Sequence, residues 1–453
     1  IWPVVINEIM YHPITEDDGD EFIELHNHGT HAVDLSGWRI RGGISFNIPP
    51  GIRLSPGGYL VVAADAARMR SRCAWLNETN CVGNFAGRLS DRNDTVRLQM
   101  PEALITTNAA GQWVTNIVHV TISEVTYWDG GEWGRWADGG GSSLELTDPR
   151  ADPRLASAWA DSDESQTCGW VTIEHTGVLD HGHSSYPASE LHVLALGPGE
   201  YDLDDVQVLN ASGQNLITNG TFTSGASGWT ARGSHQDSEW RADAGESGGG
   251  FRIRASWRGD PGVNRVGAKL TSTIATGTVA TLRARVRWRA GHPEVLLRLR
   301  GNWLEATGSL LTTQVFGTPG RPNSRLVVNA PPQVWQVTHR PILPRLGQPV
   351  EVWARVDDPD AFFTPRLVYR RDPEVSTTTI PMEPRRGGFF VGTIPSPTVA
   401  GLTAFWIEVE DAAVAPAVAR YPSSAPAIEG LVLWGATNAP GSFATYHLWI
   451  TEA

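Results

Sequence analysis

Short runs of alternating apolar and polar residues recur along the whole chain. Residues 4–9 (VVINEI) and 21–25 (EFIEL) have the period of a strand with one face in water. Between them, Asp17-Asp18-Gly19-Asp20 is typical of a turn. No long run places apolar residues at i, i+3, i+4 and i+7, so we expect few helices, residues 65–72 being a short candidate. The pattern predicts an all-β chain, and 48 glycines and 30 prolines favour the many turns that such a chain needs.

Arginine recurs at alternate positions in the middle of the chain. The alternation places Ala284, Val286 and Trp288 on one face of a strand and arginines on the other. If the arginine-bearing strands are neighbours, like charges face each other, and carboxylates or an anionic ligand must compensate them. The arginines concerned are Arg252, Arg254, Arg283, Arg285, Arg287, Arg289, Arg298 and Arg300.

Two interpretations of these arginines stay open. The first is an outer sheet face neutralised by carboxylates such as Glu239, Asp243 and Glu246. The second is a surface that holds an acidic polysaccharide by bidentate guanidinium contacts. Trp229 and Trp257 lie close by in sequence and are further candidates for ligand binding.

Length and charge narrow the class of protein. A chain of 453 residues predicts about three domains. A net charge of −13 argues against non-specific nucleic-acid binding, because a polyanion would be repelled. No apolar segment is long enough to predict a membrane span.

The spacing of the cysteines indicates whether the protein is extracellular or intracellular. Cys73 and Cys81 flank a short polar loop that one disulfide could close, the alternative being two buried thiols. One isolated disulfide suits an extracellular or cell-surface protein whose signal peptide has been removed.

Six phrases resemble a bacterial lamin-tail domain: INEIMYHP, DEFIELHN, VDLSGWRI, LSPGGYLVVAAD, VGNFAGRLSDRNDTVRL and GSSLELTDP. They occur in this order within roughly the first third of the chain. The resemblance implies an immunoglobulin-like β-sandwich, and the family as a whole has no known catalytic site.

A second resemblance lies further on. LDDVQV and NLITNGTF, followed by Gly228-Trp229, are similar to the last and first strands of a carbohydrate-binding, galactose-binding-like jelly roll, here in reverse order. The order suggests a circularly permuted or strand-borrowed version. Such jelly rolls often hold structural calcium, and the resemblance implies Asp202, Asp204, Asp205 and Asn219 as oxygen donors.

The remaining phrases give the predicted domain organisation. GTPGRPNS at 317–324 is similar to the exit of lamin-tail domains, so the jelly roll is expected to be an insertion before that exit. Later strands resemble an immunoglobulin or fibronectin type III spacer. The predicted parts are a lamin-tail domain (1–163), jelly roll (164–315), Pro/Gly linker (316–325), spacer (326–426) and C-terminal strand (427–453).

The end of the sequence carries the last resemblance. YHLWIT is similar to the phrase that opens a CotH-like spore-coat kinase domain. Because no convincing catalytic set is present, we expect a non-enzymatic, secreted binding or adhesion protein for a polysaccharide or cell-surface component. The alternatives are the targeting region of a CotH-like kinase or a hydrolase, and a self-assembling subunit of a surface layer or filament.

Overall fold

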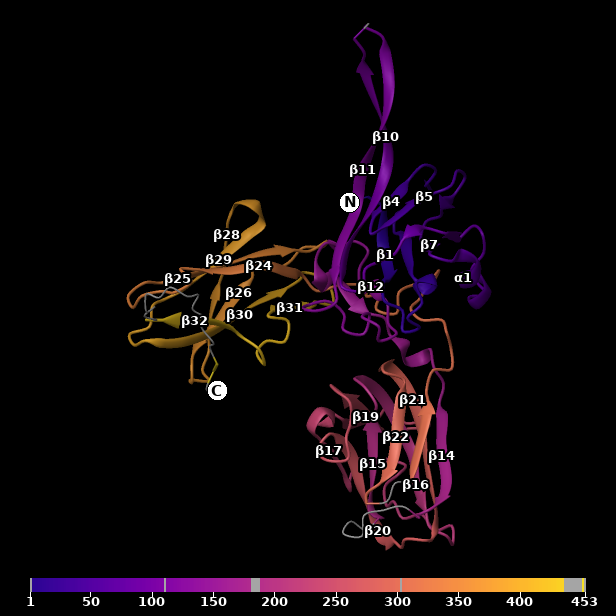
Figure 1. Cartoon of the computed structure of the whole chain (residues 1–453). Coiled ribbons are helices and arrows are strands. Elements are labelled where there is room, and N and C mark those ends of the chain that lie inside the picture. Colours follow the sequence, from indigo (N-terminus) through magenta and orange to yellow (C-terminus); the bar gives the residue numbers. More distant parts are fainter. Residues whose placement is uncertain (1, 110, 181–187, 302–303, 436–449, 452–453) are drawn as a thin grey trace, which may run out of the picture. The chain divides into compact units, whose positions relative to one another are not determined.

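The computed structural model describes residues 2–109, 111–180, 188–301, 304–435 and 450–451 (Figure 1). The chain divides into two compact units, each described here by itself. One comprises Trp2–Leu146 and Ala160–Arg325, and the other comprises Thr147–Trp159 and the described residues from Leu326 onward.

The larger unit begins with a sandwich of two sheets. Its first sheet has six strands; β1 pairs antiparallel with β12 and β2, β2 pairs antiparallel with β7, and the β7–β8 pair is parallel. In spatial order the strands are β13 (Trp159–Asp161), β12 (Leu144–Leu146), β1 (Val4–Met10), β2 (Phe22–Asn27), β7 (Tyr59–Ala63) and β8 (Cys81–Gly83).

The second sheet of this sandwich has five strands, of which the first two are the longest in the chain's described part. Their order is β11 (Trp113–Trp128), β10 (Asn93–Thr107), β4 (Arg39–Gly42), β5 (Ile44–Asn47) and β9 (Ala86–Gly87). A small sheet pairs β3 (Val33–Asp34) with β6 (Arg53–Leu54). The backbone N–H of Ile6 on β1 donates to Ser123 Oγ on β11 at 3.2 Å, which ties the two main sheets together.

The predicted short helix forms as α1 (Ala66–Arg72). The carboxylate of Asp65 accepts a hydrogen bond from the backbone N–H of Arg68 at 2.9 Å, so it caps the helix N-terminus. Short 3-10 turns lie at η1 (Asp18–Asp20), η2 (Ala156–Ala158), η3 (Glu164–Gln166), η4 (Gly233–His235) and η5 (Arg386–Gly388).

A second sandwich lies between η3 and residue 316 in sequence. Its first sheet has the order β14 (Val171–Val178), β21 (Val279–Gly291), β16 (Gly199–Leu209), β19 (Gly250–Ala255) and β18 (Glu239–Arg241). Its second sheet has the order β17 (Trp229–Arg232), β20 (Arg265–Ile274), β15 (Ala188–Ala195), β22 (Glu294–Leu299) and β23 (Glu305–Ser309). Leu203, Val286, Val193 and Leu297 from both sheets are buried in one core.

The smaller unit is a third sandwich with its own core. One sheet has the order β24 (Gln333–Arg340), β25 (Val350–Asp357), β29 (Phe389–Ile394) and β28 (Glu383–Pro384). The other has the order β27 (Thr378–Pro381), β26 (Arg366–Arg371), β30 (Gly401–Glu410) and β31 (Val418–Tyr421), and β32 (Gly430–Trp434) also pairs with β30. Val352, Leu367, Ile407 and Trp434 are buried together between these sheets.

The all-β prediction is confirmed, but the prediction that one face of the first strands is exposed to water is wrong. Every residue of β1 and β2 is buried, including Glu8 and Glu24. The reason is a segment distant in sequence, residues 317–325, which returns to these strands and covers the polar face.

The strand expected at the C-terminal end falls mainly on residues 436–449, which lie outside the described residues. Within the described part of the chain, no helix has both the length and the apolar composition that crossing a membrane requires.

Candidate functional site

The outer face of the second sandwich carries the predicted arginine ladder. On β21, Leu282, Ala284, Val286 and Trp288 are buried, and the residues between them are partly exposed. Strict alternation over this long strand therefore points its four arginines away from the core. We call the outward arginines of this sheet the arginine face; they are Arg241, Arg252, Arg254, Arg283, Arg285, Arg287 and Arg289.

The strand order places a strand with acidic residues between the two strands that carry most of the arginines. Strand β16, with its carboxylates, lies between β21 and β19, so the two arginine-rich strands are not neighbours. In the register, Asp202 is opposite Arg252 on one side and Arg287 on the other. Opposite charges across strands stabilise a sheet where like charges would destabilise it. The protein's own carboxylates thus compensate the positive charges of the arginines.

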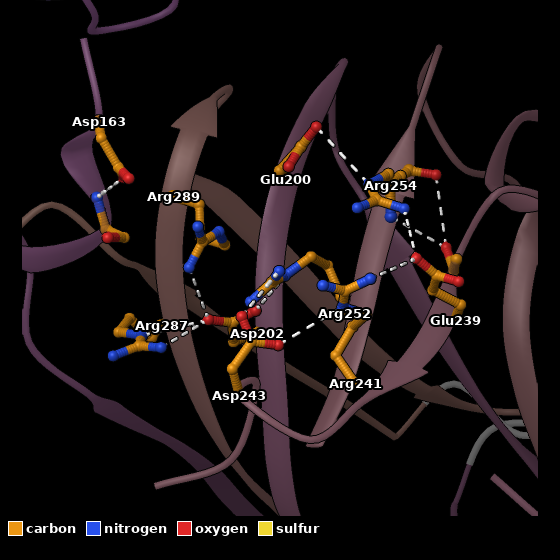
Figure 2. A network of polar contacts seen from close by, with 12 residues as sticks. Asp163, Glu200, Asp202, Glu239, Arg241, Asp243, Arg252, Arg254, Arg287 and Arg289 are labelled. Atoms are coloured by element: carbon orange, nitrogen blue, oxygen red, sulfur yellow. Dashed lines mark hydrogen bonds and ion pairs between the residues drawn. The ribbon is translucent and has the colours of Figure 1, made fainter. Parts of the chain in front are cut away.

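Asp202 is the centre of this network, as Figure 2 shows. Its side chain is fully buried, with Oδ1 accepting from Arg252 Nε at 2.8 Å. Its Oδ2 accepts from Arg287 Nη2 at 2.7 Å and Arg289 Nη1 at 3.2 Å. Arg252 is only 5% exposed, and its Nη2 has no hydrogen-bond partner. One carboxylate therefore fixes the positions of three guanidinium groups.

Two other arginines of the face, Arg285 and Arg254, have more exposed partners. Arg285 forms a bidentate pair with Glu246, at 2.9 Å from Nε and 2.5 Å from Nη2. The hydrogen bond from Arg285 lowers the pKa of Glu246. Arg254 Nη1 donates to Glu239 at 2.9 Å, but its Nε is 3.8 Å from Glu200.

One further feature of the face was missed by sequence reasoning. The indole of Trp170 lies 5.1 Å from the guanidinium carbon of Arg287, which is cation–π distance. Only the abundance of tryptophan in the chain could have signalled this contact. The Glu246 carboxylate, one of the neutralising groups that the sequence suggested, reaches Arg285 from a glycine-rich loop.

Four of the predicted ligand-binding residues are not on the arginine face. Arg298 and Arg300 belong to β22 and its end, in the other sheet, where they pair with Glu305 at 3.3 Å and Glu190 at 3.5 Å. Trp229, on β17, is buried and donates its indole N–H to the carbonyl oxygen of Asn219 at 2.7 Å. Trp257 is 69% exposed but follows β19 in a loop.

The predicted calcium ligands are not assembled into one site. The Asp202 carboxylate is occupied by arginines, which would repel a cation. Asp204 accepts hydrogen bonds from the backbone N–H groups of Asp205 and Glu246, and the Asn219 amide donates to loop carbonyls. Across the described residues, no group of three or more His, Cys, Asp or Glu side chains is placed to hold a metal ion.

The predicted Cys73–Cys81 disulfide is not formed in the structure, where both residues are buried free thiols. Cys73 Sγ lies 4.0 Å from Met69 Sδ, and Cys81 Sγ lies 4.0 Å from the carbonyl oxygen of Ala66. The two side chains therefore pack into the core around α1. Burial raises the pKa of each thiol to about 11, which disfavours the thiolate that oxidation needs.

The first sandwich contains a second polar cluster that sequence reasoning missed. Glu145, Glu8 and Glu24 are opposite one another on the neighbouring strands β12, β1 and β2, and all three are buried. Burial raises the pKa of Glu24 to about 8 and that of Glu8 well above its usual value.

The segment 317–325 supplies the hydrogen-bond donors for this row of glutamates. The backbone N–H groups of Thr318 and Gly320 donate to Glu8 and Glu24 at 2.7 and 2.5 Å. The N–H of Arg325 donates to Glu145 at 2.8 Å. Buried carboxylates with such partners hold a returning segment in place, so this cluster has a structural role rather than a ligand to bind.

Asn323 completes the attachment of this segment. Its side-chain oxygen accepts from Asn7 Nδ2 at 2.6 Å, and its Nδ2 donates to the backbone oxygens of Asn7 and Leu146 at 3.0 and 2.8 Å. The amide therefore joins the segment to both β1 and β12.

Comparison with known proteins supports the first resemblance. Residues 2–116 match the Lamin Tail Domain family model, which confirms the lamin-tail resemblance for the beginning of the chain and its immunoglobulin-like fold. No match to the chain was found among curated proteins.

Two solved structures show low similarity. A DUF4785 family protein from Legionella pneumophila subsp. pneumophila str. Philadelphia 1 has 7% identity and a TM-score of 0.17, covering 60% of this chain and 67% of that chain. The N-terminal eight Ig domains of Down Syndrome Cell Adhesion Molecule have 10% identity and a TM-score of 0.15, covering 86% of this chain and 57% of that chain. Neither similarity supports an argument about this chain.

Proposed function

We propose that this modular β-sandwich protein is a secreted, non-enzymatic binding protein that attaches to an acidic polysaccharide through its arginine face. The observation that carries the proposal is an open sheet face on which guanidinium groups are already held in position. Attachment to a cell surface would follow if that polysaccharide belongs to the surface.

The exposed arginines are the ones that a ligand can reach. The side chains of Arg283 and Arg254 are 41% and 35% exposed. Arg283 Nε is 3.6 Å from Glu174, beyond good hydrogen-bond distance. A carboxylate or sulfate group of a polymer can approach these guanidinium groups and form charge-assisted bonds, which for Arg283 would be shorter than its own pair with Glu174.

The buried part of the face supports binding in another way. Because Asp202 fixes Arg252, Arg287 and Arg289, these side chains lose little conformational entropy when a ligand binds nearby. The planar guanidinium fork also suits carboxylate and sulfate geometry better than an ammonium group does.

The dimensions of the face suit a polymer. Arg283 and Arg289 are six residues apart on β21, which corresponds to about 20 Å along a strand. An extended chain carrying repeated acidic groups can contact several of these positions at once.

The test is retention of the full chain on immobilised polygalacturonate and on a sulfated glycosaminoglycan. Arg254→Ala with Arg283→Ala should weaken binding at least about tenfold, since charge-assisted hydrogen bonds contribute about 1.5–3 kcal/mol each. Arg298→Ala with Arg300→Ala is the matched control, because it removes the same charge from the other sheet. Equal retention of wild type and both double variants would contradict the proposal, and so would equal weakening by the two.

A further inference from the structure

Strands β10 and β11 form a two-stranded arm that projects from the first sandwich (Figure 1). The last rung that β10 shares with β4 is Gln99 opposite Arg39. Beyond it, β10 and β11 pair only with each other in the described part of the chain, from Met100 opposite Val120 to Thr107 opposite Trp113. A lone hairpin of this kind is marginally stable in water unless a further surface covers it.

The composition of the arm is unlike that of the rest of the chain. Residues 100–120 contain one charged residue, Glu102, whereas the 19% charged residues of the whole chain would give about four. Exposed strand edges are usually protected by lysines or other charges, of which this arm has only Glu102. The low charge also removes the repulsion that two copies with a net charge of −13 would otherwise experience there.

Antiparallel pairing assigns each residue of the arm to one of two faces. One face, here called the tryptophan face, has Ile105, Trp113 and Ile117, which are 62%, 78% and 59% exposed. The opposite face has Leu104, Val118 and Val120, which are 49%, 38% and 36% exposed. The tryptophan face is thus the more exposed apolar surface.

We propose that the tryptophan face binds the same face of a second copy of this chain. With about 150–250 Å² for a large side chain, its three residues leave on the order of 400 Å² of apolar surface on one arm and 800 Å² across two arms. This area is below the roughly 1,200–2,000 Å² of stable specific interfaces and in the range of weak, transient ones, so the dimer is weak and its formation depends on concentration. Contact of one patch with the same patch gives a two-fold symmetric pair.

Sedimentation velocity of the full chain tests the association from about 1 to about 200 µM, the range in which small interfaces form. Wild type should pass from monomer to dimer within it. Ile105→Thr with Ile117→Thr should remain monomeric, whereas Leu104→Thr with Val118→Thr should associate as wild type does. Threonine keeps strand propensity, so the arm itself is retained.

Cross-linking identifies the face independently. Thr115→Cys adds a thiol to the tryptophan face, and Asn116→Cys adds one to the opposite face, both at exposed positions. Under mild oxidation, the Thr115→Cys variant should form a covalent dimer at least about tenfold faster, because pairing raises the effective thiol concentration. The native cysteines are buried and should not react.

Three outcomes would overturn the proposal. The first is a wild-type monomer throughout the concentration range, and the second is equal cross-linking of the two cysteine variants. The third is a monomer that binds phosphatidylcholine vesicles through the arm, which would replace the second copy by a lipid surface as the occupant.

Discussion

The Asp202→Asn variant should destabilise the second sandwich by about 3–5 kcal/mol, the range for breaking a buried ion pair by removing one partner. The substitution keeps the side-chain volume and removes the charge that three guanidinium groups share. Arg252 would suffer most, because it is 5% exposed and its next carboxylate, Asp243, is 3.6 Å away. Its positive charge would then be buried without a close partner.

The assay is equilibrium unfolding in urea, followed by tryptophan fluorescence, because Trp288 is fully buried in this sandwich and Trp170 contacts Arg287. Asp243→Asn is the matched control. It removes one carboxylate from the same network, but that carboxylate is 63% exposed and is 3.4 Å from Arg241. Its loss should cost less than about 1 kcal/mol, as exposed pairs do.

The reasoning would be refuted if Asp202→Asn cost no more than Asp243→Asn. That result would mean that the arginines relax into solvent and need no central carboxylate. The ordered positions of the arginine side chains would then have to be explained by packing of the guanidinium groups on neighbouring side chains.

The remaining predictions concern the first sandwich and the cysteines. Burial raises the pKa of Glu24 to about 8 and of Glu164 to about 7. The stability that these two protonated carboxyl groups contribute is therefore fully present below about pH 4.5 and is lost as the pH rises through 7–8. The free energy of unfolding in urea should be several kcal/mol higher at pH 5 than at pH 8.5, and a Glu24→Gln variant should narrow the gap; a higher stability at pH 8.5 would be the wrong sign. Asn323→Ala removes three buried hydrogen bonds and should cost about 2–4 kcal/mol, against about 1 kcal/mol for Ser324→Ala; equal costs would contradict the role given to the amide. Cys73 and Cys81 should resist a thiol reagent in the native protein and react fully in urea, and rapid native labelling would contradict their burial.

Local patterns in the sequence were sufficient for much of the fold. Alternation along residues 283–289 predicted the buried and outward faces of this part of β21, because side-chain direction in a strand depends only on position parity. The helix after Asp65 was likewise predictable, since its cap lies within one turn of the residues it caps.

Contacts between distant segments were not predictable in this way. Glu8 and Thr318 are 310 positions apart, so nothing near Glu8 in sequence shows that its face is covered. The same holds for Asp202 and Arg287, whose pairing depends on strand order rather than on either strand alone. Proximity in sequence also misled, because Cys73 and Cys81 are near neighbours that remain buried free thiols, packed against Met69 and the carbonyl oxygen of Ala66.

The most direct measurement of the central claim is binding of the full chain to an array that contains acidic and neutral polysaccharides. The account predicts binding to uronate- or sulfate-bearing polymers that weakens as salt is added, because guanidinium–anion contacts are screened. It also predicts that neutral polymers of similar length are not retained. Equal binding to neutral and acidic polymers, or binding to neither, would contradict the claim.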